Sequence, residues 1–261
     1  MNPLRIPIWR EARIGLERVA LGRDPVLRGH YTPRGDGRPV LLIPGFMAGD
    51  LSLSVMAGWL GRLNYEPCRA GIRANVDCTA RAVERLEAQL EALAERHDRT
   101  VTIIGHSRGG AMARVLAVRR PELVQSIVCL GSPLIDQLAV HPLVRAHVEA
   151  VAALGSLGLG GFFSRDCALG DCCAEVREQA RAPFPPAIGF VSIYSRSDGV
   201  VDWRACLDPA AEHVEVSSSH CGMAVNAAVY AAIGRALARG APVTARRSSV
   251  RAVRAAAALA A

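Results

Sequence analysis

The sequence contains no lysine, so its 31 basic residues are all arginine. They outnumber the 24 acidic residues and give the chain a formal net charge of +7 at pH 7. A basic protein can bind nucleic acid or anionic lipid. However, the arginines of residues 81–99 alternate with glutamate, as on a solvated helix face, and motifs for nucleic-acid binding are absent. We therefore expect no nucleic-acid partner.

Long apolar runs are absent too. The first residues contain no continuous apolar stretch of about 7–15 residues, so the sequence predicts no signal peptide. No apolar run reaches the roughly 18 residues of a membrane-spanning helix. We therefore expect a cytoplasmic location. Peripheral membrane contact stays an alternative because the carboxyl end carries a basic cluster, Arg246, Arg247, Arg251 and Arg254.

The eight cysteines include no C-x-x-C pair, so the ligand spacing of a zinc finger is missing. Three of them, Cys167, Cys172 and Cys173, lie close together beside Asp166 and Asp171. A metal site or a disulfide in this group stays an alternative, but free thiols are the expectation for a reducing cytosol. The sequence therefore predicts no metal and no cofactor.

The segment Gly105-His106-Ser107-Arg108-Gly109 has the pattern G-x-S-x-G. The β-branched residues at 100–104 predict a buried strand before it, and residues 110–119 favour a helix after it. A serine on such a sharp strand-to-helix turn exposes its hydroxyl above the sheet, and flanking glycines allow the turn to be tight. Ser107 is therefore the candidate nucleophile.

A serine nucleophile needs a base that removes its proton. In the chain order Ser…Asp/Glu…His, that base lies downstream, after a later strand. His220 fits this position, because it follows an alternating segment at residues 213–217 and precedes an alanine-rich helical stretch. We therefore expect His220 to be the general base for Ser107.

The base in turn needs an acid that fixes its tautomer and stabilises its protonated form. The strand predicted at 188–195 runs into a turn-rich loop that carries two acids, Asp198 and Asp202. Asp198 is favoured because it follows the strand closely and precedes a glycine in a tight turn. Asp202 also fits a cap for the segment that begins at Trp203, and it stays the alternative.

Acyl transfer also requires N–H donors aimed at the oxyanion of the tetrahedral intermediate. One donor is expected from the amide of the residue after the nucleophile, Arg108. The apolar strand predicted at Pro39–Ile43 is followed by the loop Pro44–Gly49, and such a loop supplies the second donor. The amide of Phe46 is the best candidate in that loop.

In five segments the chain resembles the α/β-hydrolase superfamily, and within it bacterial lipases and esterases. The resemblance implies an α/β fold with a mostly parallel, doubly wound sheet, helices on both faces and a site at the carboxyl ends of the strands. It also implies that the chain is a serine hydrolase. The segments that carry it are LLIPGF (Leu41–Phe46), GHSRGG (Gly105–Gly110), LGSP (Leu130–Pro133), YSRSDGVVDW (Tyr194–Trp203) and SSHCGM (Ser218–Met223).

By this resemblance Ser107, Asp198 and His220 form a catalytic triad, and the amides of Phe46 and Arg108 form the oxyanion hole. The expected reaction is hydrolysis of a carboxylic ester through an acyl-enzyme, with a small-molecule or lipid ester as substrate. Two alternatives stay open. One is an acyltransferase that uses the same acyl-enzyme, and the other is a binding protein with a non-catalytic hydrolase fold.

The apolar pattern predicts one α/β domain over residues 39–239. Residues 1–38 form an N-terminal extension with a short helix at 8–21, and residues 240–261 form a basic, Ala/Arg-rich tail that we expect to be disordered. The predicted strands lie at 39–44, 66–70, 100–105, 125–130, 188–195 and 213–217. The predicted helices lie at 50–62, 79–97, 109–119 and 222–239.

Residues 133–186 are too many for a simple crossover between strands, and we expect them to form a cap or lid insertion. Residues 141–154 fit an amphipathic helix, and the glycine-rich apolar segment 155–163 follows it. Such a segment suits a mobile lid over an apolar acyl site. An ordinary loop packed against the core is the alternative.

Overall fold

The computed structural model describes residues 6–239, without the side chains at positions 168 and 169, so the tail expected at 240–261 lies outside the described residues. Its centre is a six-stranded sheet in the order β2-β1-β3-β4-β5-β6, and every neighbouring pair is parallel. The strands are β1 (Pro39–Ile43), β2 (Glu66–Arg69), β3 (Val101–His106), β4 (Val124–Leu130), β5 (Gly189–Tyr194) and β6 (Glu212–Glu215).

The chain changes direction across the sheet between β1 and β3. β2 lies on one side of β1, and the later strands continue from β3 on the other side. In open parallel sheets, ligands bind outside the carboxyl ends of the strands at such a switch point. The loops after β1 and β3 carry Phe46 and Ser107, so the fold brings both residues to this position.

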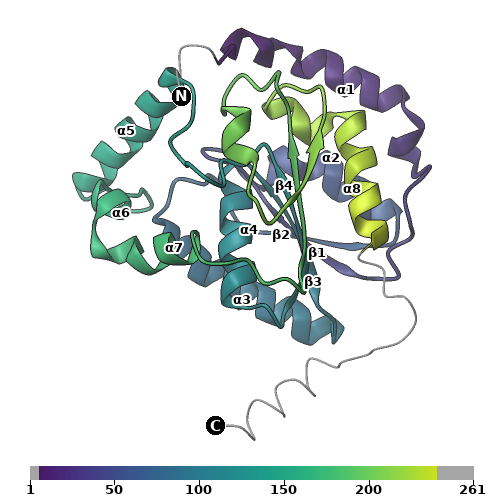
Figure 1. Cartoon of the computed structure of the whole chain (residues 1–261), viewed down its shortest axis with the longest axis horizontal. Helices are drawn as coiled ribbons and strands as arrows, with labels where there is room; N and C mark the ends of the chain where they lie inside the picture. Colours follow the sequence, from purple (N-terminus) through teal and green to yellow (C-terminus); the bar gives the residue numbers. More distant parts are fainter. Residues whose placement is uncertain (1–5, 240–261) are drawn as a thin grey trace, which may run out of the picture.

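Helices cover both faces of the sheet (Figure 1). The first core contains residues of α1, α2 and α8, and the second contains residues of α3, α4 and α7. The helices are α1 (Ile14–Arg23), α2 (Ser54–Arg62), α3 (Thr79–His97), α4 (Arg108–Arg119), α5 (Pro142–Ser156), α6 (Asp166–Leu169), α7 (Ala174–Gln179) and α8 (Ala227–Arg239).

β1 shows why the central strands are apolar throughout. Val40 and Leu42 point into the first core, and Leu41 and Ile43 point into the second. Because the side chains of a strand alternate between two covered faces, the strand needs an uninterrupted apolar run. The edge strands β2 and β6 instead carry charged, more exposed residues, which protect the sheet against pairing with other chains.

The predicted strands are confirmed, with ends that differ by up to two residues. The single helix predicted over residues 222–239 is wrong in its first part. A short 3-10 helix, η7 (Cys221–Val225), comes first, and Asn226 is extended. Its side-chain oxygen accepts hydrogen bonds from the N–H groups of Ala228 and Val229, so Asn226 caps α8 and separates it from η7.

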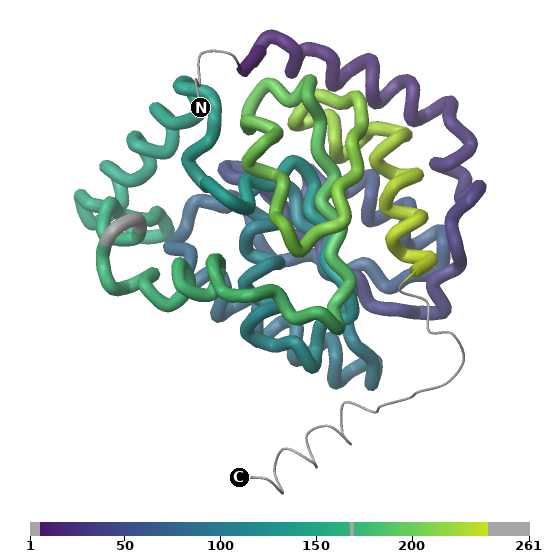
Figure 2. Tube along the Cα trace, viewed as in Figure 1, coloured from purple at the N-terminus to yellow at the C-terminus, as the bar shows by residue number. Residues whose placement is uncertain are grey.

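The N-terminal segment packs beside the carboxyl-terminal part of the domain. The 3-10 helix η2 (Ile8–Arg13) leads into α1, and both contact η7. In Figure 2 the trace of this segment runs along the same side of the molecule as α8. A helix was expected at residues 8–21, and its first turns are of the 3-10 type.

The segment between β4 and β5 contains α5, α6 and α7, with the short 3-10 helix η5 (Asp171–Cys173) between the last two. In Figure 1 these helices gather on the left, away from α1 and α8. The amphipathic helix expected at 141–154 corresponds to α5. None of the described helices is both long and apolar enough to cross a membrane.

Candidate active site

Ser107 occupies the turn between β3 and α4 with φ 53° and ψ −121°. A positive φ is uncommon in a residue with a side chain, and it costs conformational energy that the surroundings must supply. Packing enforces the turn, since a Cβ atom at Gly109 would overlap the carbonyl oxygen of Ile43 and lie 2.7 Å from that of Pro44. The backbone of β1 thus fixes the turn that presents the serine.

His220 and Asp198 form a buried pair. The Nδ1 atom of His220 lies 2.7 Å from the Oδ2 atom of Asp198, and each residue is only 4% exposed. The other carboxylate oxygen, Oδ1, accepts hydrogen bonds from the N–H groups of Val200 and Val201 at 2.8 and 2.7 Å. The carboxylate is therefore held in place on one side and aimed at the imidazole on the other.

The side chain of Asp202, the alternative acid, forms its hydrogen bonds with the segment that follows it. Its Oδ1 atom accepts a hydrogen bond of 3.0 Å from the N–H of Arg204 and caps the 3-10 helix η6 (Trp203–Cys206). The structure therefore pairs His220 with Asp198, while Asp202 serves a local turn.

The electrostatics of His220 favour the binding of a proton by its imidazole. Burial opposes the protonated form, but the charge and hydrogen bond of Asp198, together with the charge of Glu11, raise the pKa of His220 above its usual value. A base with a raised pKa removes a proton from a hydroxyl more readily.

His106 contacts both the ring and the backbone of His220. Its ring packs against the ring of His220, with the two centroids 4.8 Å apart. Burial, with a smaller contribution from the charge of His220, lowers the pKa of His106 to about 3, so its ring is neutral. Its Nε2 atom lies 3.0 Å from the carbonyl oxygen of His220, and it must be the donor because a carbonyl only accepts.

Ser107 and His220 line the same cavity, although no hydrogen bond joins their side chains within the described residues. Catalytic hydrogen bonds of this kind are often formed only when substrate is bound. The structure thus brings Asp198 and His220, the candidate acid and base, into contact and places Ser107, the candidate nucleophile, on the same cavity wall as His220.

The two residues expected to supply oxyanion amides are joined through Asn75. Phe46 pairs with Asn75 in an isolated parallel bridge, and the Asn75 side chain donates a hydrogen bond of 2.8 Å to the carbonyl of Pro44. The guanidinium of Arg108 donates to the carbonyls of Asn75 at 2.8 Å and Asp77 at 2.6 Å. Sequence reasoning considered only the amide of Arg108, whereas its side chain anchors the loop beside Phe46.

Two glutamates of the N-terminal segment belong to the site and were missed by the sequence analysis. Glu11 accepts hydrogen bonds from the N–H groups of Gly199, His220 and Cys221 at 2.8–2.9 Å. Glu17, which is buried, accepts hydrogen bonds of 2.8 Å from both the N–H and the hydroxyl of Ser219. No local motif marks these glutamates, because their partners are about 200 residues away.

The cavity in front of Ser107 has a volume of about 430 Å³. α5 contributes Val144 and Val148 to its wall, and the loop that follows α5 contributes Phe163. The remaining apolar wall comes from the first turn of α4 and from loops that follow strands, and it includes Met47, Ala111, Pro133, Leu138, Val140 and Val200. An apolar chain fits such a wall better than a polar group does.

The sequence is similar to known enzymes over part of its length. Residues 70–154 match a family described as the alpha/beta hydrolase fold. Two curated triacylglycerol lipases, from Pseudarthrobacter phenanthrenivorans and Burkholderia plantarii, are each 28% identical to this chain over 104 residues. The match covers 36% of this chain and 33% and 29% of the two lipases, so it spans only about a third of the relatives' length.

Solved structures match more of the chain at lower identity. The mature form of a Bacillus licheniformis lipase superposes with a TM-score of 0.56 at 14% identity, over 78% of this chain and 93% of that chain. A monoacylglycerol lipase from Paleococcus ferrophilus superposes with a TM-score of 0.52 at 13% identity, over 80% and 95%. At such identities the likeness shows the fold, and a fold alone does not assign a reaction.

Proposed function

Because the chain has the α/β-hydrolase fold and is similar to lipases and esterases, we propose that it is a serine hydrolase of carboxylic esters. One observation carries the proposal. His220, buried and joined to Asp198 by a 2.7 Å hydrogen bond, lines an apolar cavity together with Ser107 on its strained turn. This is the arrangement that nucleophilic acyl transfer by serine requires.

In the acylation step, Nε2 of His220 takes the proton of the Ser107 hydroxyl while the oxygen attacks the ester carbonyl. Asp198 stabilises the imidazolium that forms and holds its Nδ1 proton. The negative oxygen of the tetrahedral intermediate accepts hydrogen bonds from the amides of Phe46 and Arg108. His220 then gives its proton to the leaving alcohol, and an acyl-enzyme remains.

In the second step, His220 takes a proton from water, and the hydroxide attacks the acyl-enzyme. Collapse of the second tetrahedral intermediate releases the carboxylic acid and returns the proton to Ser107. No cofactor enters either step. The apolar cavity wall supports an ester with an apolar acyl group as the substrate.

Labelling by a fluorophosphonate probe tests the proposal. We expect the folded wild-type protein to be labelled and Ser107→Ala to remain unlabelled. Ser126→Ala is the matched control, because Ser126 lies near the amino end of β4, far from the turn of Ser107. No labelling of folded wild-type protein, or equal labelling of the Ser107→Ala variant, would refute a serine mechanism.

Turnover of p-nitrophenyl esters with increasing acyl length tests the substrate class. The cavity predicts that kcat/KM rises as the acyl chain lengthens and then falls once the chain outgrows the cavity. Product analysis in the presence of a competing alcohol separates hydrolysis from acyl transfer. Hydrolysis alone supports the proposal, whereas predominant formation of a new ester would make the protein an acyltransferase.

A further inference from the structure

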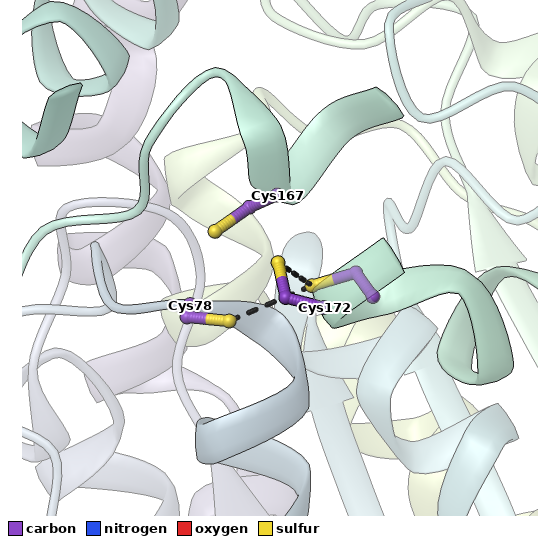
Figure 3. A group of neighbouring side chains, drawn as sticks. Cys78, Cys167 and Cys172 are labelled. Atoms are coloured by element: carbon purple, nitrogen blue, oxygen red, sulfur yellow. Dashed lines mark hydrogen bonds between the residues drawn. The ribbon is translucent and has the colours of Figure 1, made fainter. Parts of the chain in front are cut away.

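Four cysteines converge beside the active-site cavity. Cys167, Cys172 and Cys173 come from the segment between β4 and β5, as the sequence grouping anticipated. The fourth, Cys78, comes from the α/β domain outside this segment, and it immediately precedes α3. Figure 3 shows that Cys78 and the two labelled cysteines of the insertion lie on different elements that face one another.

The spacing of the sulfur atoms fits a single metal ion. All four Sγ atoms lie within 4.8 Å of one another, with 3.5 Å between Cys78 and Cys173 and 3.8 Å between Cys172 and Cys173. Four thiolates at about 2.3 Å from a tetrahedral zinc ion are about 3.8 Å apart. We propose that Cys78, Cys167, Cys172 and Cys173 form a structural zinc site that fastens the insertion to the α/β domain.

A disulfide explains this cluster less well. A bond between Cys78 and Cys173 would use only two of the four convergent thiols. Such a disulfide would not explain why the sulfur atoms of Cys167 and Cys172 lie beside those of Cys78 and Cys173. Tetrahedral coordination by sulfur alone is the preference of zinc among the common divalent ions, whereas calcium and magnesium prefer oxygen.

The surroundings of the cluster suit its charge. Each thiol loses its proton as its sulfur binds the metal, so four protons leave and the zinc tetrathiolate carries a charge of −2. Cys78 is at the N-terminus of α3, where the helix dipole stabilises negative charge. Arg108 and Arg81 both lie close enough to the cluster to interact electrostatically with Cys78 and Cys167.

The loop that carries three of the ligands is already ordered by an arginine. Arg177 donates hydrogen bonds to the carbonyl of Gly170 at 2.7 Å and to that of Cys167 at 3.4 Å. These bonds hold the chain between Cys167 and Cys172 in a tight curve. Cys172 is exposed, so a metal ion has a path into the cluster from solvent.

Four protein ligands close the coordination sphere, so the ion has a structural and not a catalytic role. Its influence on the reaction is indirect. Cys167 lines the substrate cavity, and Val76, two residues before Cys78, accepts a hydrogen bond of 2.7 Å from the N–H of Phe163. Zinc therefore holds in place Phe163, which lines the same cavity as Ser107.

Metal analysis of the full-length protein tests the proposal. Protein produced in zinc-supplemented medium and purified without chelator is expected to contain about one zinc ion per chain. Cys167→Ser and Cys172→Ser are expected to lose most of this zinc, while Cys68→Ser keeps it, because Cys68 lies on the edge strand β2. Circular dichroism confirms that each variant is folded.

Cobalt provides a readout that does not depend on activity or on the variants. Cobalt(II) added to the metal-free wild-type protein is expected to give the visible absorption of tetrahedral cobalt–thiolate coordination. A folded, reduced wild-type protein that binds neither zinc nor cobalt would overturn the proposal. A Cys78–Cys173 disulfide, mapped by mass spectrometry after the thiols are blocked at lysis, would overturn it as well.

Discussion

Glu11 accepts a hydrogen bond of 2.8 Å from the backbone N–H of His220, although 209 positions separate the two residues. The same carboxylate oxygen accepts a hydrogen bond from Gly199, the residue directly after Asp198. One side chain of the N-terminal segment therefore binds both the loop of Asp198 and the loop of His220. A segment that looks peripheral in the sequence is part of the site.

Glu11→Gln tests this link. The substitution keeps the size of the side chain but removes its charge, and an amide offers only one oxygen where Glu11 uses two. We expect kcat to fall about 10- to 100-fold, because small misplacements of catalytic groups are costly. We also expect the acidic limb of the pH profile of kcat/KM to move to lower pH, since Glu11 raises the pKa of His220.

The shift of the pH profile distinguishes positioning from a general loss of structure. Glu178→Gln is the matched control, because Glu178 is exposed on α7. An unchanged acidic limb in Glu11→Gln would show that the carboxylate does not act on His220.

The two candidate acids give opposite expectations. Asp198→Asn leaves His220 without a carboxylate, and we expect kcat to fall about 10⁴-fold with little change in stability. Asp202→Ala removes the cap of η6 and a contact with the exposed Arg204 side chain, so it is expected to cost about 1 kcal/mol of unfolding free energy and to leave kcat nearly unchanged. Steady-state kinetics and urea denaturation of both variants measure these effects. Loss of activity in Asp202→Ala alone would reverse the assignment.

The buried pair of histidines makes stability depend on pH. His106 has its pKa lowered from 6.5 to about 3 by burial and by His220, so the unfolded chain binds its proton more readily than the folded chain does. The unfolding free energy is therefore expected to fall by about 1.4 kcal/mol per pH unit for this one group between these two values. His220, whose pKa is raised, acts in the opposite direction.

His106→Gln separates the two contributions, because glutamine keeps a side-chain N–H donor but does not titrate. Urea denaturation at several pH values is expected to show a shallower loss of stability towards acid in this variant. An identical pH dependence in wild type and variant would mean that His106 is not buried in its neutral form.

Gly109 is expected to tolerate no side chain. In Gly109→Ala the new Cβ atom overlaps the carbonyl oxygen of Ile43, so the turn of Ser107 must move. We expect a loss of several kcal/mol in unfolding free energy, since backbone cannot give way as a flexible side chain does. Gly61→Ala is the control, as nothing lies within 4 Å of its new Cβ, and it is expected to stabilise α2 by about 0.5–1 kcal/mol.

Exposed apolar residues of the insertion lead us to expect higher ester turnover at a lipid–water interface. α5 lines the cavity, while Leu157 and Leu159 after it are 80% and 49% exposed. If residues 157–159, which precede the three clustered cysteines of the insertion, move as a lid, aggregated ester or detergent micelles bind these apolar residues and turnover rises. We expect Leu157→Ser to reduce that rise without changing the rate on a short soluble ester. A turnover rate that changes neither with detergent micelles nor with aggregation of the ester would contradict a lid.

Apolar patterning predicted the order of strands and helices because each central strand is buried on both faces and each covering helix has an apolar side. The turn at Ser107 was also predicted from the sequence, since glycines near a serine on both sides indicate a sharp strand-to-helix junction. These are local properties of the chain. For the same reason the sequence placed Asp198 and His220 at strand exits, where the fold brings them within hydrogen-bond distance.

The remaining features depend on contacts between distant segments. The sequence around Glu11 and Glu17 contains no motif that predicts a partner beyond residue 198. Cys78 is likewise distant in sequence from the cysteines of the insertion, and only the fold brings it beside them. The break before α8 was missed because one asparagine, Asn226, outweighs an alanine-rich stretch that favours a continuous helix.

The buried contact between Glu17 and Ser219 joins two segments that are 202 positions apart. Closing so long a loop costs chain entropy, so contacts between residues nearer in sequence form more readily. We therefore expect the loop of His220 to reach its place beside Asp198 late in folding, after the parallel sheet has formed.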